Sequence, residues 1–315
     1  MLFFATTIDG LQMGLCFAVL ALGVHISYSI LDFADLSVDS TFPLGGVCCT
    51  IFMLRLGLNP LLALLITFVI GMLAGSLTSL LHVKFNISKL LSGIIVMTGL
   101  LSVNLALTKL LTRTGQTTTI FSYRSENIKG VFGGEFVEIF GKEAKDYVIL
   151  GILLLFVLAV KLIIDLFLKT KMGYMLKATG SNERLVVSLG KNVGFYKILG
   201  LALANGFVAV SGGLYANLYM QYDNTCGSGK VVLALASVII GTAVFSRIRF
   251  IKDTTAVIFG AIIYSLCLNY LVLVDTNGIY LKLLTAVMFA LILIFNEKTR
   301  YLFYSKVKKG VPADD

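Results

Sequence analysis

Three carboxylates in the segment 30–46, ILDFADLSVDSTFPLGG, are the residues best placed to do chemistry in this chain. Asp32, Asp35 and Asp39 lie in or beside apolar stretches, where an isolated charge is costly and marks an ion or substrate pathway. Nearby hydroxyl groups can satisfy the backbone of an unwound turn, and Pro43 suits the start of a following helix. We therefore interpret the segment as a break in a membrane helix beside a solute path, with an ordinary acidic loop as the alternative.

No catalytic or nucleotide-binding arrangement accompanies these carboxylates. The sequence GSGK at 227–230 resembles part of a phosphate-binding loop. That loop needs G-x-x-x-x-G-K-[ST], whereas Asn224 and Val231 occupy the outer positions here. The two histidines and five cysteines show no metal-ligand spacing, and of the cysteines only Cys226 falls in a predicted exposed loop. We expect no enzyme activity, cofactor or metal site in this chain, and we expect GSGK to be a flexible external turn with one basic residue.

A basic segment between residues 169 and 194 carries the signals of a short amphipathic helix. Thr179, Ser181 or Asn182 can cap its start, and Gly190 fits its end. The predicted apolar stripe and its polar edge comprise Leu185, Val186, Leu189, Glu183 and Arg184. Such a helix docks in a groove on a partner, or, as the alternative, lies on lipid.

The elements that must position these groups are membrane helices. Hydrophobic residues make up 57% of the 315 residues and charged residues only 14%, and one soluble core cannot bury this apolar excess. Apolar runs mark nine transmembrane helices, the second of them short. They lie near 9–30, 41–56, 60–82, 88–110, 147–168, 195–220, 230–248, 254–274 and 279–296. We therefore expect an all-α polytopic fold in a single transmembrane domain, 1–315.

The placement of Lys and Arg predicts an N-terminus outside the cell and a C-terminus in the cytoplasm. In that orientation the inside segments hold sixteen Lys and Arg residues and the outside segments nine, as the positive-inside rule requires. Residues 111–146 then form an external loop, 169–194 a cytoplasmic loop and 297–315 a cytoplasmic tail.

Two parts of the chain share one pattern of apolar helix, polar break and Gly-bearing helix. The first is 10–46, and the second is 198–241 with YDNTCGSGK as its break. In the predicted topology the two units run in opposite directions. Inverted repeats with broken helices are a transporter architecture, so the pattern predicts an inverted repeat.

Two motifs resemble those of permease subunits in the branched-chain amino-acid and ribose importer family, whose transport is driven by ATP-binding cassette subunits. Residues 178–190 resemble the family's cytoplasmic coupling loop, ATG-x-N-x-x-x-A-x-x-x-G, with Val186 in place of the usual alanine. The stretch 21–46 is closer still and resembles the sub-branch associated with binding proteins for aromatic amino acids such as tryptophan and tyrosine. Ala34 and Ser40 stand where proline and glycine are common in that sub-branch.

The resemblance implies a permease of the bacterial cell (plasma) membrane that pairs with a second copy of itself as a homodimer. It also implies two cytoplasmic ATPase subunits, which would bind ATP and Mg, and an external substrate-binding protein. The expected path residues at the two breaks are Phe33, Asp35, Leu36, Ser37, Asp39, Asn205, Tyr215, Asn217 and Tyr222. The expected ATPase-coupling residues are Ala178, Thr179, Gly180, Asn182, Glu183, Arg184, Leu189 and Gly190.

We expect the transported solute to be a small polar molecule, namely an amino acid. The more specific expectation is an aromatic amino acid. The competing hypothesis is a secondary transporter of inverted-repeat type driven by Na⁺ or H⁺, in which Asp32, Asp35 and Asp39 would bind the driving ion. The amphipathic cytoplasmic loop favours the importer, because a secondary transporter does not need a docking helix.

Overall fold

The computed structural model describes residues 2–111, 121–122, 145–245, 251–274, 283, 285–291 and 294. The helices before the long loop are α1 (Leu2–Val24), its continuation as the π-helix η1 (His25–Ile30), α2 (Val38–Leu54), α3 (Pro60–Phe85) and α4 (Lys89–Leu111). Those after it are α6 (Lys145–Leu168), α7 (Lys171–Ser181), α8 (Glu183–Ser188), α9 (Val193–Tyr219), the 3-10 helix η3 (Asn224–Gly227), α10 (Lys230–Phe245) and α11 (Asp253–Val274). The two-residue strands β1 (Phe121–Ser122) and β2 (Gln221–Tyr222) pair antiparallel.

The predicted all-α polytopic fold is confirmed. Seven described helical segments are long and apolar enough to cross a membrane, and α2 is a shorter apolar helix, as the sequence predicts for the second span. Of the ninth predicted span, residues 283, 285–291 and 294 are helical, and the remainder lies outside the described residues. Most of the predicted external loop and the whole tail 297–315 also lie outside them.

Local sequence signals explain where α3 begins and ends. Asn59 caps its start, because its side-chain oxygen accepts a hydrogen bond from the backbone N–H of Leu61 at 3.1 Å. Pro60 occupies the first helical position, where no N–H is needed. Asn86 ends the helix in the left-handed conformation with φ of 56°.

Glycines allow α9 to pack closely between α2 and α3. A Cβ atom at Gly71 would lie 2.5 Å from the carbonyl oxygen of Asn205, and Gly75 meets the carbonyl of Leu201. On the other side, Gly45 meets the backbone of Ala209. Small residues bring membrane helices into backbone contact in this way, so these glycines fix α9 inside the bundle.

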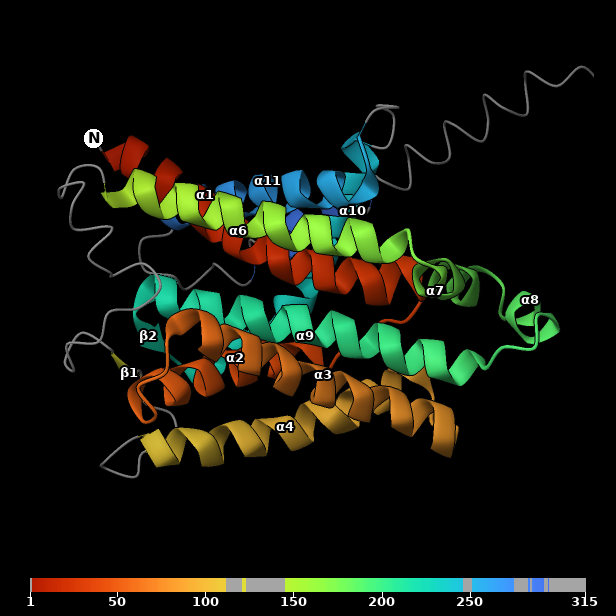
Figure 1. Ribbon diagram of the computed structural model, residues 1–315. Helices are drawn as coiled ribbons and strands as arrows, with labels where there is room; N and C mark the ends of the chain where they lie inside the picture. Colours follow the sequence, from red (N-terminus) through yellow and green to blue (C-terminus); the bar gives the residue numbers. More distant parts are fainter. Residues whose placement is uncertain are drawn as a thin grey trace, which may run out of the picture.

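The predicted inverted repeat is present. In each unit a long helix (α1, α9) is followed by a break, a shorter helix (α2, α10) and another long helix (α3, α11). Figure 1 shows α1 and α9 running in opposite directions, with α7 and α8 at one end of the bundle and β2 at the other. The units interlock, because α3 packs on α9 and α11 packs on α1.

Two local predictions are wrong. The helix after the first break begins at Val38 rather than near residue 41, so Pro43 lies inside α2. Pro43 has no N–H to give to the carbonyl of Asp39, and Gly227 packs against that carbonyl from the second break. Cys226, which we placed in an exposed loop, is half-buried against a hydrophobic cluster because η3 folds back onto α2.

Candidate functional site

The two predicted breaks meet at Asp39. Its Oδ1 accepts a hydrogen bond from the backbone N–H of Val231 at 2.8 Å, and its Oδ2 accepts one from Gly229 at 3.2 Å. The carboxylate of the first break therefore caps α10, which follows the second break. A negative charge at a helix N-terminus is favourable, and α2 and α10 begin side by side as a result.

Asp35 ties the first break to the middle of α9. The side chain is buried, with Oδ1 accepting from the backbone N–H of Ser37 at 2.8 Å and Oδ2 from the Nδ2 amide of Asn205 at 2.7 Å. The Ser37 hydroxyl donates in turn to Asn205 Oδ1 at 3.4 Å. Of the predicted path residues, these three form one hydrogen-bonded network.

Asp32 lies apart from this network. It is exposed, its φ is 52°, and its carboxylate pairs with Lys89 at 3.3 Å. Within the part of the chain that the structure describes, no group of three or more His, Cys, Asp or Glu side chains converges as a metal site would require. The three aspartates therefore have three separate sets of partners.

An aromatic cluster surrounds Lys230 at the start of α10. The Lys230 Nζ lies 4.1 Å from the centre of the Phe17 ring, 5.3 Å from that of Phe42 and 5.2 Å from that of Tyr215. Ring faces attract cations at these distances. The prediction that GSGK is a flexible external turn is wrong for its lysine, because Asp39 holds the turn against α2 and directs Lys230 inward.

Of the four other predicted path residues, Leu36 packs against the aromatic cluster and the other three pack outside it. Phe33 contacts the ring of His82 edge-on, with 5.4 Å between ring centres. Leu36 packs against the cluster that contains Phe17 and Phe42. Asn217 donates to the Gly213 carbonyl and to Cys49 Sγ, and the Tyr222 hydroxyl donates to Asn224. Asn217 and Tyr222 therefore stabilise the α2–α9 region.

The predicted amphipathic helix is α8, and its start and end are as expected. Asn182 Oδ1 accepts from the backbone N–H of Leu185 at 3.3 Å, and Gly190 follows the helix with φ of 67°. The predicted stripe needs correction, because Val186 is fully buried against its own chain. The exposed apolar side chains are Leu185, Val187 and Leu189.

Two contacts fasten α7 and α8 to the membrane helices. Gly180 packs directly on the backbone carbonyl of Ile30 at the end of η1. Glu183 forms an ion pair with Lys197 at the start of α9, with 2.7 Å between Oε1 and Nζ. Thr179 is buried, Ala178 is half-buried, and Arg184 is exposed. A force on α8 would therefore reach both η1 and α9.

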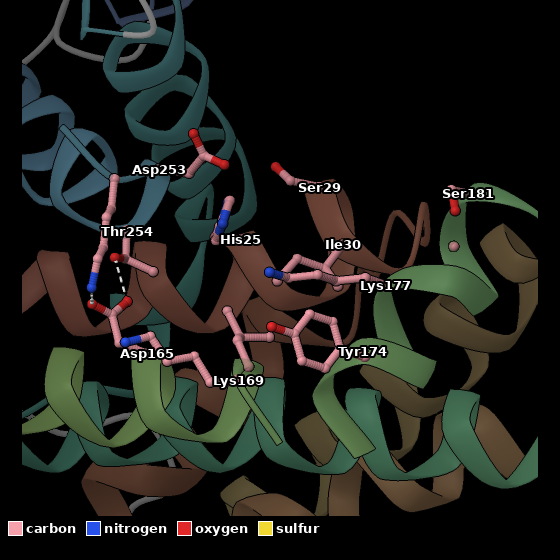
Figure 2. Close-up of a pocket in the computed structure, with 13 residues that line it drawn as sticks. His25, Ser29, Ile30, Asp165, Lys169, Tyr174, Lys177, Ser181, Asp253 and Thr254 are labelled. Atoms are coloured by element: carbon pink, nitrogen blue, oxygen red, sulfur yellow. Dashed lines mark hydrogen bonds and ion pairs between the residues drawn. The ribbon is translucent and has the colours of Figure 1, made fainter. Parts of the chain in front are cut away.

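A cleft of about 580 Å³ opens beside α7, and we refer to it as the α7 cleft (Figure 2). Its walls come from the end of α6, η1, α7 and the start of α11. Asp165 anchors one wall by accepting from Thr254 Oγ1 at 2.7 Å and from Lys252 Nζ at 3.0 Å. No local sequence motif indicates this cleft, because its walls come from segments that are far apart along the chain.

Comparisons with known proteins identify similarity to transport permeases. Residues 6–295 match the model of a family described as the permease component of branched-chain amino acid transport systems. A tyrosine transport system permease protein of Clostridioides difficile (strain R20291) is 40% identical over 89% of this chain and 88% of its own length. An uncharacterized protein of Rickettsia prowazekii (strain Madrid E) is 28% identical over 89% of this chain and 94% of its own. No solved structure matches significantly.

Proposed function

From the premise that this chain belongs to the family of permease components of branched-chain amino acid transport systems, we propose that it forms the membrane path of an ATP-driven importer for aromatic amino acids. As a permease it is a transport component and not an enzyme, and ATP hydrolysis takes place on a partner ATPase. The protein is a multi-pass membrane protein. Its N-terminus lies outside the cell and its C-terminus in the cytoplasm in this proposal.

The observation that carries the proposal is the construction of α7 and α8. Leu185, Val187 and Leu189 are each about half exposed or more on a short helix that leaves the membrane bundle. The Gly180–Ile30 contact and the Glu183–Lys197 ion pair join that helix to η1 and α9. An exposed apolar face fastened to two transmembrane elements suits a docked motor subunit, and a self-powered transporter has no use for it.

The junction of the two breaks supports the position of the path. Broken helices in inverted repeats place polar groups near the middle of the membrane. Here Asp35, Asn205 and Asp39 lie at that junction with Lys230 beside them. We place the solute path along this junction, between two copies of the chain.

An amino-acid substrate is supported by Lys230 and by the relative that is named a tyrosine transport permease. Among the described residues, no carboxylate lies within ion-pair distance of Lys230, although the charge of Asp39 acts on it. An unpaired cation beside a membrane path attracts anions. The carboxylate of a passing amino acid fits this cation, and the rings of Phe17 and Tyr215 suit an aromatic side chain.

The competing secondary transporter would use the aspartates as ligands of a driving ion. The geometry of the described residues disfavours it, because Asp35 is satisfied by neutral donors, Asp39 caps α10 and Asp32 pairs with Lys89. Among the described residues, these carboxylates therefore have no shared centre at which a Na⁺ ion would bind.

The test is to express the chain with its ATPase and binding-protein partners and to reconstitute the purified complex in liposomes. We expect an ATPase to copurify, and labelled tyrosine to enter only with ATP and the external binding protein present. A Na⁺ or H⁺ gradient alone should drive no uptake. Uptake driven by either gradient in the chain alone, and lost in Asp35→Asn, would establish the secondary transporter instead.

A further inference from the structure

The α7 cleft contains a buried polar atom that its own surroundings do not satisfy. His25 is 4% exposed, and its Nδ1 has no hydrogen-bond partner among the described residues. Buried ring nitrogens are ordinarily hydrogen-bonded. Figure 2 shows the His25 ring in the cleft, between Asp253 of α11 on one side and Lys177 of α7 on the other. The charges of both of those groups act on it.

The charges of the cleft wall divide into a neutralised group and a free group. Asp165 holds two lysines, Lys252 at 3.0 Å and Lys161 at 3.3 Å, so its carboxylate is fully engaged. Lys177 and Asp253 form no ion pair with any described residue, although both line the cleft. Lys169 also lines the cleft and forms no ion pair with any described residue. The cleft therefore presents two free lysines and one free carboxylate, and of the two lysines Lys177 is the one whose charge acts on His25.

The remaining wall is suited to a side chain of moderate size. Ile30 and Leu168 contribute apolar surface, and Tyr174 contributes a ring. Ser29 and Ser181 add hydroxyl groups at the rim. A volume of about 580 Å³ accommodates a small organic molecule.

We propose that the α7 cleft binds a free zwitterionic amino acid from the cytoplasm. Its carboxylate pairs with Lys177, its ammonium group pairs with Asp253, and His25 Nδ1 gives a further hydrogen bond at the floor. That this ligand is the transported amino acid, and that the cleft opens to the cytoplasm, rests on the function proposed above.

A ligand in this position would act on coupling. It would join Lys177 of α7 to Asp253 of α11 across η1, and α7 carries α8, to which the ATPase docks in the proposed complex. Because Gly180 already meets Ile30 without clearance, a second bridge between α7 and the bundle would oppose movement of α7. High cytoplasmic amino acid would therefore slow further uptake.

The experiment measures binding of labelled L-tyrosine to the permease–ATPase complex in nanodiscs, without the binding protein. Two probes each lack one charge: tyramine has no carboxylate, and hydroxyphenylpropanoate has no ammonium group. We expect each to bind at least about tenfold more weakly than L-tyrosine, since one charge-assisted pair is worth about that factor. Lys177→Gln and Asp253→Asn should each weaken L-tyrosine binding by a similar factor.

Two controls separate the cleft from the membrane path and from misfolding. Lys171→Gln changes an exposed lysine of the same helix outside the cleft, and it should bind normally. Lys177→Gln and Asp253→Asn should retain ATP-driven uptake when the ATPase side holds no amino acid. When L-tyrosine is added on the ATPase side, uptake should slow in the parent chain and should not slow in these two variants. Equal affinity for all three probes, or unchanged binding in both variants, overturns the proposal. So does absence of binding by a complex that still imports tyrosine, whereas absence of ATP-driven uptake would instead count against the proposed function.

Discussion

At the scale of single residues, the charged groups of the junction are satisfied in different ways. Asp35 accepts hydrogen bonds from a backbone N–H and from an amide, so both of its carboxyl oxygens have donors from the protein. Asp39 binds two backbone N–H groups of α10. Lys230 lies against the faces of aromatic rings, which attract a cation without neutralising it. It forms no ion pair with a described carboxylate, although the charge of Asp39 acts on it. Lys230 is therefore the group at the junction with capacity for a substrate carboxylate.

Replacing Lys230 by methionine tests this role. Lys230→Met keeps the length of the side chain and its contact with the rings, and removes the charge. We expect the KM for binding-protein-dependent tyrosine uptake to rise by about tenfold, the effect of losing one charge-assisted contact, while the ATPase rate stimulated by the loaded binding protein is retained.

Lys230→Arg is the matched control, because guanidinium also stacks on aromatic rings and keeps the charge. It should transport within a small factor of the parent chain. Wild-type KM in Lys230→Met would rule out contact with the substrate, and a fall in thermal stability with unchanged KM would assign Lys230 a structural role only.

At the scale of elements, the sequence predicts where α8 begins and ends, but not which side of the helix is buried. The Asn182 cap and Gly190 are local signals, because each acts on backbone within a few residues. Which side of so short a helix turns inward depends on the neighbouring elements, and Val186 rather than Leu185 was buried. The exposed face that remains is the one that the ATPase would contact in the proposed complex.

A charge placed on the exposed face of α8 tests whether that face binds the ATPase. Val187 is 63% exposed, so Val187→Asp should leave folding unchanged and abolish either copurification of the ATPase or ATP-driven uptake. Lys171→Glu, a charge reversal at the exposed start of α7, should do neither. Full ATP-driven uptake by Val187→Asp would show that α8 lies on lipid rather than on a partner.

At the scale of the whole molecule, the sequence predicted the spans and the repeat, because hydropathy and polar breaks are properties of continuous segments. Hydropathy and polar breaks do not predict contacts between segments that are far apart in the sequence. Asp39 meets Val231, which is 192 positions away, and this contact is what turned Lys230 inward. The α7 cleft, built from η1, α6, α7 and α11, escaped prediction for the same reason.

The predicted orientation in the membrane rests on the distribution of Lys and Arg over the whole chain, and it can be measured directly. In a Cys267→Ser parent, which removes an exposed thiol, Leu56→Cys places a thiol in the exposed turn after α2, and Lys191→Cys places one after α8. An impermeant maleimide should label position 56 only from outside the cell and position 191 only from the cytoplasm. The reverse pattern would invert the topology and remove α8 from the reach of a cytoplasmic ATPase.

The long-range bonds of the first break also bear on how the protein is made. Asp35 finds Asn205, 170 positions later, and Asp39 finds Gly229, 190 positions later. A ribosome delivers α1 to α4 to the membrane well before either partner has been synthesised, so these carboxylates enter the bilayer without their native hydrogen bonds. The amino-terminal half is then an unfinished intermediate that depends on insertion of α9 and α10. A chain that stops before residue 193 would remain in that state and be recognised by membrane proteases.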